Sequence, residues 1–279
     1  MRGAAIDVDD GTSIELGCRF LVVADGANSR FGRTLGTHRD RRWPYAVSIA
    51  TMVHSARGPD RWAETHLGPL HAAGEPVTGH GWVHPMGGNR LSIGVTISSS
   101  YRDVLSVNIV DLLDRFVEQM ATSWSFDPDV RLVEPQRWRT PVGGSGSPVM
   151  GPTFLVTGDA GGLANPFSAH GVGAALTTAR LAADVLDEAL TVGNSTTLQR
   201  YPAELTSAFG EYHKVGRLTA RFLGRPWLLR AALRAGAGND IAMGAALRIG
   251  TGALRAEGRS GAERAYRAAS FVSRFAPSW

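Results

Sequence analysis

The chain has 279 residues but only one cysteine and one lysine. Cys18 alone cannot form an intrachain disulfide or a cysteine-based zinc site, so a reducing cytoplasm is the expected compartment. Because Lys214 is the only lysine, nearly all the positive charge is arginine, and the formal net charge is +4. No run of 18 apolar residues occurs, so no transmembrane helix is predicted. The start meets Asp7 too early to resemble a signal peptide.

The sequence also contains no Gly-X-Gly-X-X-Gly motif. In dinucleotide-binding folds that turn holds a pyrophosphate at the start of a helix. Gly171-Val172-Gly173 supplies only two of the three glycines, and it follows a loop rather than a strand. The residues by themselves therefore do not predict a complete dinucleotide site.

What the chain does contain is a strand, a Gly-Asp stop, a loop of small residues and a helix start, within residues 154–176. Gly158 and Asp159 end the predicted strand, and Pro166 closes the loop. A helix is expected to begin near Gly173. Its unpaired N–H groups and positive dipole end attract anions, and glycine lets backbone approach a ligand closely. The stretch is typical of a nucleotide site.

A second segment has the same form near the start of the chain. Residues 20–24 are a continuous apolar run, as expected for a strand that is covered on both faces. The run ends on Asp25-Gly26, which places a second carboxylate at a sheet edge. Taken alone, this motif favours an ordinary buried strand that ends in an Asp-Gly turn over a nucleotide site.

Residues 43–100 have the alternation of an antiparallel sheet with interspersed aromatic residues. His80, Trp82 and His84 share one face of a predicted strand. The two histidines are about 13 Å apart at the usual rise of a strand, which argues against a metal site. Packed aromatic side chains and a wall that faces a substrate remain alternatives.

The rest of the chain is predicted to be mainly helical. The expected elements are an amphipathic helix over 108–120, a strand over 131–139, and helices over 176–186, 198–222, 226–236, 241–249 and 251–279. After Lys214 the chain is strongly basic and ends on Phe271, Phe275 and Trp279. This region is either a solvated helical appendage or a contact with an anionic membrane. Nucleic acid is not expected, because no recognised binding module accompanies the charge.

The order of the two motifs, Ala24-Asp25-Gly26 and Gly158-Asp159, resembles the FAD fold of the p-hydroxybenzoate hydroxylase superfamily. The resemblance implies an α/β class with an α+β substrate domain: an incomplete glutathione-reductase-type FAD-binding fold with an inserted antiparallel sheet and a C-terminal helical region. The implied domains are a partial FAD-binding domain at 1–42 and 151–195, a substrate domain at 43–150, and a helical basic region at 196–279.

Within that superfamily the chain is similar to the geranylgeranyl reductase family, which includes reductases of menaquinone side chains. Residues 158–166 are similar to the family's G-D-A-A-G-x-x-N-P, and residues 79–85 to its Y-x-W-x-F-P signature. The chain departs from the family pattern in two places. His80 and His84 replace Tyr and Phe, and Ala169-His170-Gly171 replaces G-E-G.

The resemblance implies FAD as the cofactor and NAD(P)H as a candidate electron donor. The residues expected to bind FAD are Asp25, Gly26, Gly158, Asp159, Ala160, Pro166, Gly171, Val172 and Gly173. The residues expected to contact an isoprenoid or other apolar substrate are His80, Trp82, His84 and Pro85. No metal site and no catalytic residue is predicted, although a histidine has a suitable pKa for proton donation.

The implied function is reduction of isoprenoid C=C bonds by hydride transfer from reduced flavin, in the cytoplasm or at the inner face of the membrane. One alternative is an FAD-dependent monooxygenase of an aromatic or polyketide substrate. Another is a truncated, non-catalytic fragment, because the family's N-terminal part with its G-x-G-x-x-G turn is expected upstream of Met1. The chain alone is therefore expected not to retain FAD.

Overall fold

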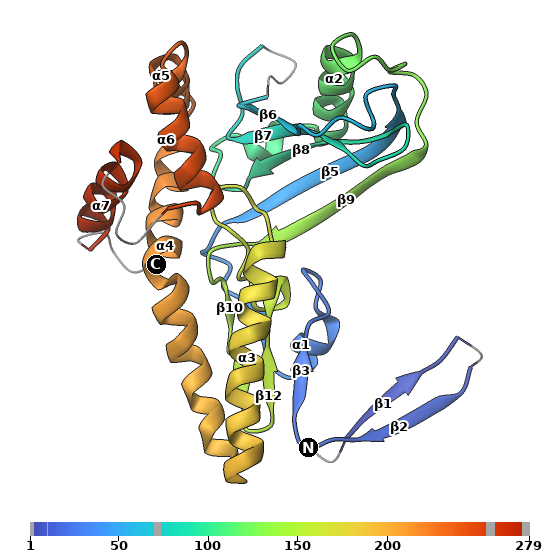
Figure 1. Ribbon diagram of the computed structural model, residues 1–279, viewed down its shortest axis with the longest axis vertical. Coiled ribbons are helices and arrows are strands. Elements are labelled where there is room, and N and C mark those ends of the chain that lie inside the picture. Colours follow the sequence, from blue (N-terminus) through green and yellow to red (C-terminus); the bar gives the residue numbers. More distant parts are fainter. Residues whose placement is uncertain (1–2, 10, 70–73, 255–259, 275–279) are drawn as a thin grey trace.

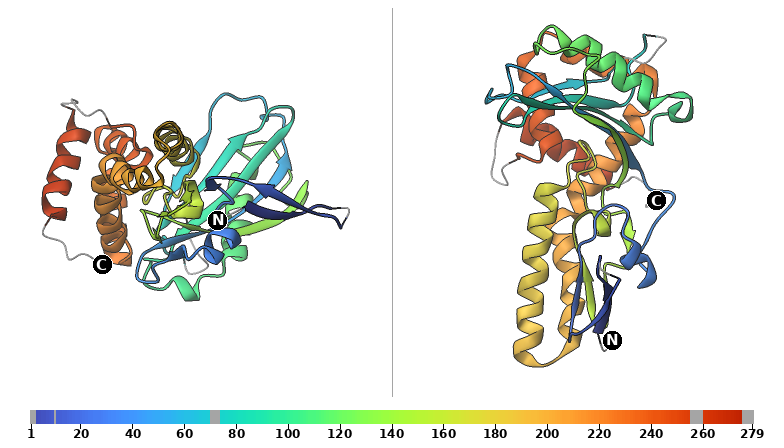
Figure 2. Two further views of the ribbon diagram at one scale, coloured as in Figure 1. Left: turned by 90° about the horizontal axis from the view of Figure 1, so that it is seen from below. Right: turned by 90° about the vertical axis from the view of Figure 1, so that its right-hand side faces the viewer.

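The computed structural model describes residues 3–9, 11–69, 74–254 and 260–274. Figures 1 and 2 show a large sheet at one end and a small sheet toward the other, with the two long helices α3 and α4 running beside the small sheet. The strands are β1 (Gly3–Asp7), β2 (Ser13–Gly17), β3 (Leu21–Val23), β4 (His38–Arg39), β5 (Tyr45–His54), β6 (Glu64–Leu67), β7 (Gly79–Pro85), β8 (Arg90–Ser98), β9 (Val133–Pro141), β10 (Gly146–Ser147), β11 (Met150–Gly151) and β12 (Phe154–Val156). The α-helices are α1 (Arg30–Thr34), α2 (Ile109–Ala121), α3 (Val172–Val192), α4 (Arg200–Leu223), α5 (Pro226–Gly236), α6 (Asp240–Thr251) and α7 (Gly261–Ser273).

The large sheet has the strand order β6-β7-β8-β5-β9, and neighbouring strands are antiparallel. Its two faces differ, because side chains alternate along each strand. On β8 the apolar residues Leu91, Ile93, Val95 and Ile97 are buried in a core with α2. The opposite face of the strand carries small residues such as Thr96, and this face is free to line a cavity. The antiparallel sheet predicted for residues 43–100 is confirmed.

Helix α2 covers the apolar face of this sheet (Figure 1). Its buried side chains recur every three or four residues, which is the period of one helix face. They are Ile109, Leu112, Leu113, Phe116, Val117 and Met120. Asn108 caps the start, since its side chain accepts a hydrogen bond from the backbone N–H of Val110 at 3.0 Å. The helix predicted over residues 108–120 is confirmed within one residue.

The small sheet has the order β11-β12-β3, and β12 and β3 are parallel. Leu21 pairs with Phe154, and Val23 with Val156. Because parallel strands end at the same edge, this pairing brings the Asp-Gly turn after β3 beside the Gly-Asp turn after β12. The sequence predicted that the strand within residues 20–24, which is β3, is covered on both faces. This is wrong for Val22, which is 43% exposed. Strand β3 lies at the edge of this sheet, which leaves Val22 open.

Helices α3 and α4 hold the small sheet from one side. Leu155 of β12 packs with Ala182, Val185 and Leu198 in one buried cluster. The hydroxyl of Tyr201, at the start of α4, donates a hydrogen bond to the carbonyl of Val156 at 3.0 Å. The end of β12, where Gly158 and Asp159 follow, is therefore fixed by packing and by a buried hydrogen bond.

The other predicted helices are present, with shifted ends. The last helix, α7, is shorter than the predicted helix over 251–279, and Arg255, Arg259, Phe275 and Trp279 lie outside the described residues. The strand predicted over 131–139 runs two residues later, because its pairing with β5 extends to Pro141. Within the described parts of the chain, no helix combines the length and the apolar character needed to span a bilayer.

Candidate functional site

A chamber of about 560 Å³ lies where the large sheet, the edge of the small sheet and the start of α3 meet. The large sheet contributes the polar face of its central strands, including Ser48 and Thr96, whose hydroxyls are hydrogen-bonded at 2.7 Å. The small sheet contributes the turns that follow β3 and β12. Five separate segments of the sequence, within residues 24–26, 48–50, 80–96, 138–140 and 157–175, therefore form one cavity.

Aromatic rings from β7 and β9 line the sheet side of the chamber. Trp82 lies 5.9 Å from His80, 6.2 Å from His84 and 6.5 Å from Trp138, measured between ring centroids. Trp82 pairs with Gly94 on β8, and a Cβ on that glycine would lie 2.3 Å from the indole Cζ2. Only glycine lets the indole lie across the strand. The prediction that residues 80, 82 and 84 share one face is confirmed.

His170, from the loop before α3, lies against the same two histidines. Its ring centroid is 6.0 Å from that of His80 and 6.5 Å from that of His84. The three imidazoles therefore surround the chamber side of Trp82. Among the described residues no group of three or more metal-ligating side chains has the geometry to hold an ion.

Burial makes two histidines of this cluster, His80 and His84, resistant to protonation. Desolvation, followed by the charges of His170 and His84, lowers the pKa of His80 to about 4. Desolvation and then the charge of His170 also lower the pKa of His84. Near neutral pH, His80 is consequently an uncharged ring that can donate and accept hydrogen bonds.

Asp159 faces the chamber from the opposite side. Its Oδ1 atom is buried and has no hydrogen-bond partner among the described residues, and burial raises the pKa of its carboxyl group. The carboxylate can occupy this position because residue 171 is a glycine: a Cβ there would lie 2.4 Å from Oδ1. A buried carboxylate without donors is unfavourable, so this site is ready to accept hydrogen bonds from a ligand.

The start of α3 presents further unused polar groups to the chamber. The first intrahelical hydrogen bond runs from the N–H of Ala175 to the carbonyl of Gly171, and no side chain caps the helix. Ser168 adds a buried hydroxyl that has no partner among the described residues. These groups would match a ligand that has hydroxyl groups and an anionic ring. The hydroxyl groups would bind Asp159 and Ser168, and the ring would lie at the start of α3. FAD has both features at its ribityl and flavin end, so the residues present fit that end of the cofactor.

The chamber brings together eight of the predicted site residues. They are Gly26, His80, Trp82, His84, Gly158, Asp159, Gly171 and Val172. Five others lie elsewhere. Asp25 accepts a hydrogen bond from the backbone N–H of Phe31, in the following helix α1, at 3.1 Å. Pro85 does not line the chamber. Ala160, Gly173 and Pro166 line three neighbouring cavities.

One of these neighbours is a strongly apolar cavity of about 340 Å³ between the large sheet and helices α4, α5 and α6. His80, Thr96 and Ala169 line both this cavity and the chamber, so the two are neighbours. Trp82 lines the chamber rather than this cavity, and helices α4, α5 and α6 supply nearly half of the cavity's wall. The alanines and leucines of these helices did not predict a cavity, because the cavity forms only where the helices pack against the sheet.

The fold is that of flavin-dependent oxidoreductases. A geranylgeranyl bacteriochlorophyll reductase-like protein from Thermoplasma acidophilum superimposes with a TM-score of 0.65, over 80% of this chain and 54% of that protein, at 22% identity. A flavin-dependent brominase superimposes with a TM-score of 0.60, over 98% of this chain and 66% of the brominase, at 15% identity.

Sequence similarity places the chain more narrowly. It is 30% identical to menaquinone reductase of Mycobacterium tuberculosis over 274 residues, which are 98% of this chain and 64% of that enzyme. It is 27% identical to digeranylgeranylglycerophospholipid reductase of Methanosarcina mazei, over 66% of this chain and 43% of that enzyme. No family model matches the chain. The chain is similar to the geranylgeranyl reductase-like family of FAD oxidoreductases, and it spans less than two thirds of the length of these relatives.

The buried histidine gives a prediction about stability. His80 takes up a proton near pH 6.5 in the unfolded chain but only near pH 4 in the folded protein. The stability that its neutral form preserves is therefore fully present above pH 6.5 and is lost as the pH falls toward 4. In that range it adds a slope of up to about 1.4 kcal/mol per pH unit to the free energy of unfolding. We expect the free energy of unfolding of His80→Gln, measured by urea denaturation at several pH values, to rise less steeply with pH than that of the parent. His54→Gln, at an exposed site, should keep the parent slope; equal slopes in all three proteins would contradict the burial of His80.

Proposed function

We propose that this chain forms the flavin and substrate chamber of an FAD-dependent reductase of isoprenoid carbon–carbon double bonds. The observation that carries the proposal is the position of His80, which lines both an apolar cavity and a chamber with a buried carboxylate oxygen that has no partner among the described residues. An extended hydrocarbon chain matches the first cavity, and the flavin end of FAD matches the second. The relatives named for menaquinone and geranylgeranyl lipids support this choice of substrate class.

Three features of the chain would hold the cofactor. Asp159 would accept hydrogen bonds from the ribityl hydroxyls, and Ser168 offers a further hydroxyl beside it. The N–H groups at the start of α3, with the positive end of the helix dipole, would stabilise negative charge on the flavin ring by about 0.3–2 kcal/mol. When bound and reduced, FAD supplies the hydride for reduction of the double bond. NAD(P)H is the proposed source of its electrons.

The chain's own residues would position the other reactant. Small alanines of α4, α5 and α6 leave room for a prenyl chain against the sheet, and His80 marks the point where it meets the chamber. Because His80 is neutral at pH 7, it would orient the substrate rather than donate the required proton. Trp82 and Trp138 would exclude water from the sheet side of the chamber.

Removing the charge of Asp159 tests the cofactor site. In Asp159→Asn we expect affinity for FAD to fall about tenfold or more, since hydrogen bonds to a charged acceptor contribute about 1.5–3 kcal/mol. The flavin-free protein should become more stable near pH 7, because the raised pKa of Asp159 shows that burial disfavours its charged form. Flavin fluorescence titration and thermal unfolding measure the two effects. Asp184→Asn, on the far half of α3, is the control that should change neither.

Filling the apolar cavity tests the substrate class. Phenylalanine at Ala220 of α4 would occupy space that a prenyl chain needs. Each buried methylene contributes about 0.8 kcal/mol, so excluding two should weaken binding of geranylgeraniol by about tenfold. Ala203→Phe places the same ring on an exposed part of the same helix and should bind normally. Calorimetry with both variants gives the comparison, and equal binding would contradict the proposed position of the chain.

The reaction type is tested with FAD and NADPH in excess. The proposal predicts a saturated product from a prenyl substrate under anaerobic conditions. Product that forms only with oxygen and carries a new hydroxyl group would instead favour the alternative, a monooxygenase.

We also propose a peripheral membrane contact beside the apolar cavity. Trp227 of α5 is 61% exposed and Ile241 of α6 is 83% exposed, and both helices line that cavity. The exposed arginines Arg225 and Arg234 flank Trp227 in sequence. Apolar residues with nearby arginines suit the surface of an anionic bilayer, from which a lipid substrate would enter.

Sedimentation with phosphatidylglycerol vesicles tests the contact. Replacing both Trp227 and Ile241 by alanine should weaken binding about tenfold, because their apolar surface is no longer buried in the lipid. Trp62→Ala removes a tryptophan that is 79% exposed and does not line the cavity, and should have no effect. Binding that is the same at low and high salt would contradict the electrostatic part of the contact.

A further inference from the structure

A short loop lies between the chamber and the apolar cavity. It comprises residues 166–170, which lead into the start of α3, and we call it the partition loop. Ser168 and His170 line the chamber, Phe167 lines the apolar cavity, and Ala169 lines both. The course of this loop therefore decides which side chains each of the two cavities presents.

Asn165 precedes the partition loop and bonds to its backbone at both ends. Its N–H donates to the carbonyl of His170 at 3.0 Å, and its carbonyl accepts from the N–H of Ala169 at 2.9 Å. Its side-chain Oδ1 accepts from the N–H groups of Phe167, at 2.8 Å, and Ser168, at 3.2 Å. An asparagine side chain that bonds to the backbone just after it holds a turn in one conformation.

The backbone of Ala169 needs this support. Its φ of 56° lies in the left-handed region, which a residue with a Cβ rarely occupies. Such a conformation persists only where the surrounding structure holds it. The hydrogen bonds of Asn165 hold it on both sides, at Ala169 itself and at His170. His170 leaves this turn with its ring nearly parallel to that of His80, at an angle of 18°.

The side-chain amide of Asn165 also ties the partition loop to two helices. Its Nδ2 donates to the hydroxyl of Tyr212 in α4 and to the carbonyl of Gly250 in α6, both at 3.0 Å. The Tyr212 hydroxyl donates in turn to the carbonyl of Ile249 at 2.7 Å. Burial raises the pKa of Tyr212 to about 12, so its hydroxyl keeps the proton that it donates. The loop is thereby joined to both helices through one amide group.

Helix α4 leaves the partition loop no room on its own side. A Cβ on Gly216 would lie 2.2 Å from Cγ of Pro166 and 3.0 Å from Cε2 of Phe167. The rings of Tyr212 and Phe167 lie 5.2 Å apart, measured between centroids. Because this side is closely packed, a loop that loses its hydrogen bonds can only move away from α4.

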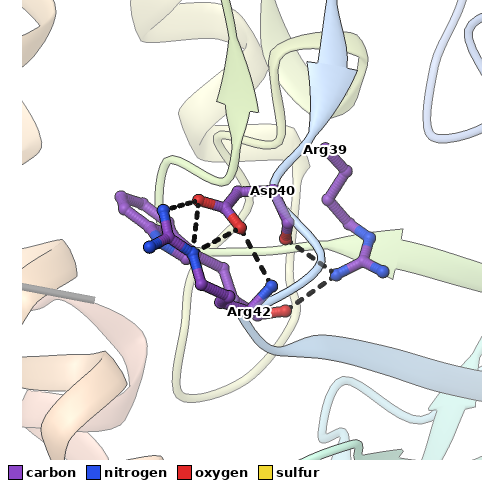
Figure 3. Close-up of polar contacts among 4 residues, drawn as sticks. Arg39, Asp40 and Arg42 are labelled. Carbon is purple, nitrogen blue, oxygen red and sulfur yellow. Dashed lines mark hydrogen bonds and ion pairs between the residues drawn. The ribbon is translucent and has the colours of Figure 1, made fainter.

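This part of α4 is itself anchored to the turn between β4 and β5. The guanidinium group of Arg217 lies over the indole of Trp43, 4.0 Å from the ring centroid. The Nη1 of Arg39 donates to the carbonyls of Trp43, at 2.8 Å, and Asp40, at 3.1 Å (Figure 3). Arg42 forms an ion pair with the carboxylate of Asp40 at 2.6 Å, which holds the turn further (Figure 3). Helix α4 therefore gives the partition loop a fixed support.

We propose that Asn165 and Tyr212 are positioning residues that hold Ser168 and His170 at the wall of the chamber. Neither Asn165 nor Tyr212 lines the chamber or the apolar cavity, so both act through the partition loop and not on a bound ligand. This role rests on the proposed function, since the wall that they hold would then face the flavin. The hydrogen bonds are formed without flavin, so they can be tested in its absence.

NMR titration of the histidine rings in flavin-free protein tests this positioning. Desolvation and the charge of His170 hold the pKa of His80 at about 4. Movement of the partition loop lets water reach this ring, so we expect the pKa of His80 to rise by about 1 or more, toward its ordinary value of 6.5. Asn165→Ser keeps an oxygen beside the loop but is too short to reach Tyr212. Tyr212→Phe removes only the hydroxyl. The signal of His80 is identified by its loss in His80→Gln.

Two variants are matched controls. Tyr266→Phe removes the same hydroxyl from a tyrosine whose ring lies 6.3 Å from that of Tyr212, but whose side chain bonds to Glu211. Asn194→Ser shortens an asparagine whose Oδ1 accepts from the N–H of Thr196 at 3.0 Å, at an exposed site. Both controls should leave the pKa of His80 at about 4.

The other titratable groups around His80 are the same in every variant. Those that share a cavity wall with it, besides His170, are His84, Asp159 and Tyr45. No substitution adds or removes a charge at neutral pH. A change in the pKa of His80 therefore reports on the partition loop.

A raised pKa of His80 in Asn165→Ser and Tyr212→Phe, and in neither control, supports the proposal. If Asn165→Ser does not fold, Tyr212→Phe decides the outcome. A pKa that stays at about 4 in the folded variants overturns the proposal, even where their melting temperature falls, because Asn165 and Tyr212 would then only stabilise the fold. An equal rise in the controls overturns it as well. Neither flavin nor a prenyl compound is present, so failure here leaves the tests of reductase function unaffected.

Discussion

The parallel pairing of β3 with β12 is the constraint on which the rest of the structure depends. It places two turns, more than 130 residues apart in sequence, at one edge of the small sheet. Helix α3 begins beside that edge, and packing against α4 holds it there. Without this register Asp159 would not face the large sheet, and the chamber would lose one of its walls. The pairing needs no polar side chain, because it rests on main-chain hydrogen bonds and on buried residues such as Leu155 and Val156.

The site divides its tasks between two kinds of surface. The polar chamber leaves a buried carboxylate, a buried hydroxyl and a helix start without partners, at a cost in stability to the ligand-free protein. The neighbouring cavity is lined mainly by alanine, leucine and glycine, with a few threonines and a serine as its polar groups besides His80 and Tyr45. His80 lies where the two meet, uncharged at neutral pH. This arrangement suits a reaction in which a charged cofactor must meet an apolar chain with water excluded.

Much of this could be predicted from local patterns. Alternation fixed the strands of the large sheet, and the three- to four-residue period fixed α2, since both report which side of an element is buried. The shared face of His80, Trp82 and His84 followed from the same rule. His170 could not be paired with them, because it lies almost 90 residues away on a loop. The carboxylate of Asp25 was expected at the cofactor, and in the structure it accepts a hydrogen bond from the backbone N–H of Phe31 in α1. The apolar cavity was missed because it exists only between elements.

We propose that the flavin and the prenyl chain meet where His80 lies between the chamber and the apolar cavity. A crystal structure with FAD and geranylgeraniol soaked together tests it most directly. We expect the flavin ring to lie between Asp159 and the rings of Trp82 and His170. The prenyl chain should lie between the large sheet and helices α4 to α6. A prenyl chain bound elsewhere, such as in the cavity between α3, α4 and α7, would contradict it.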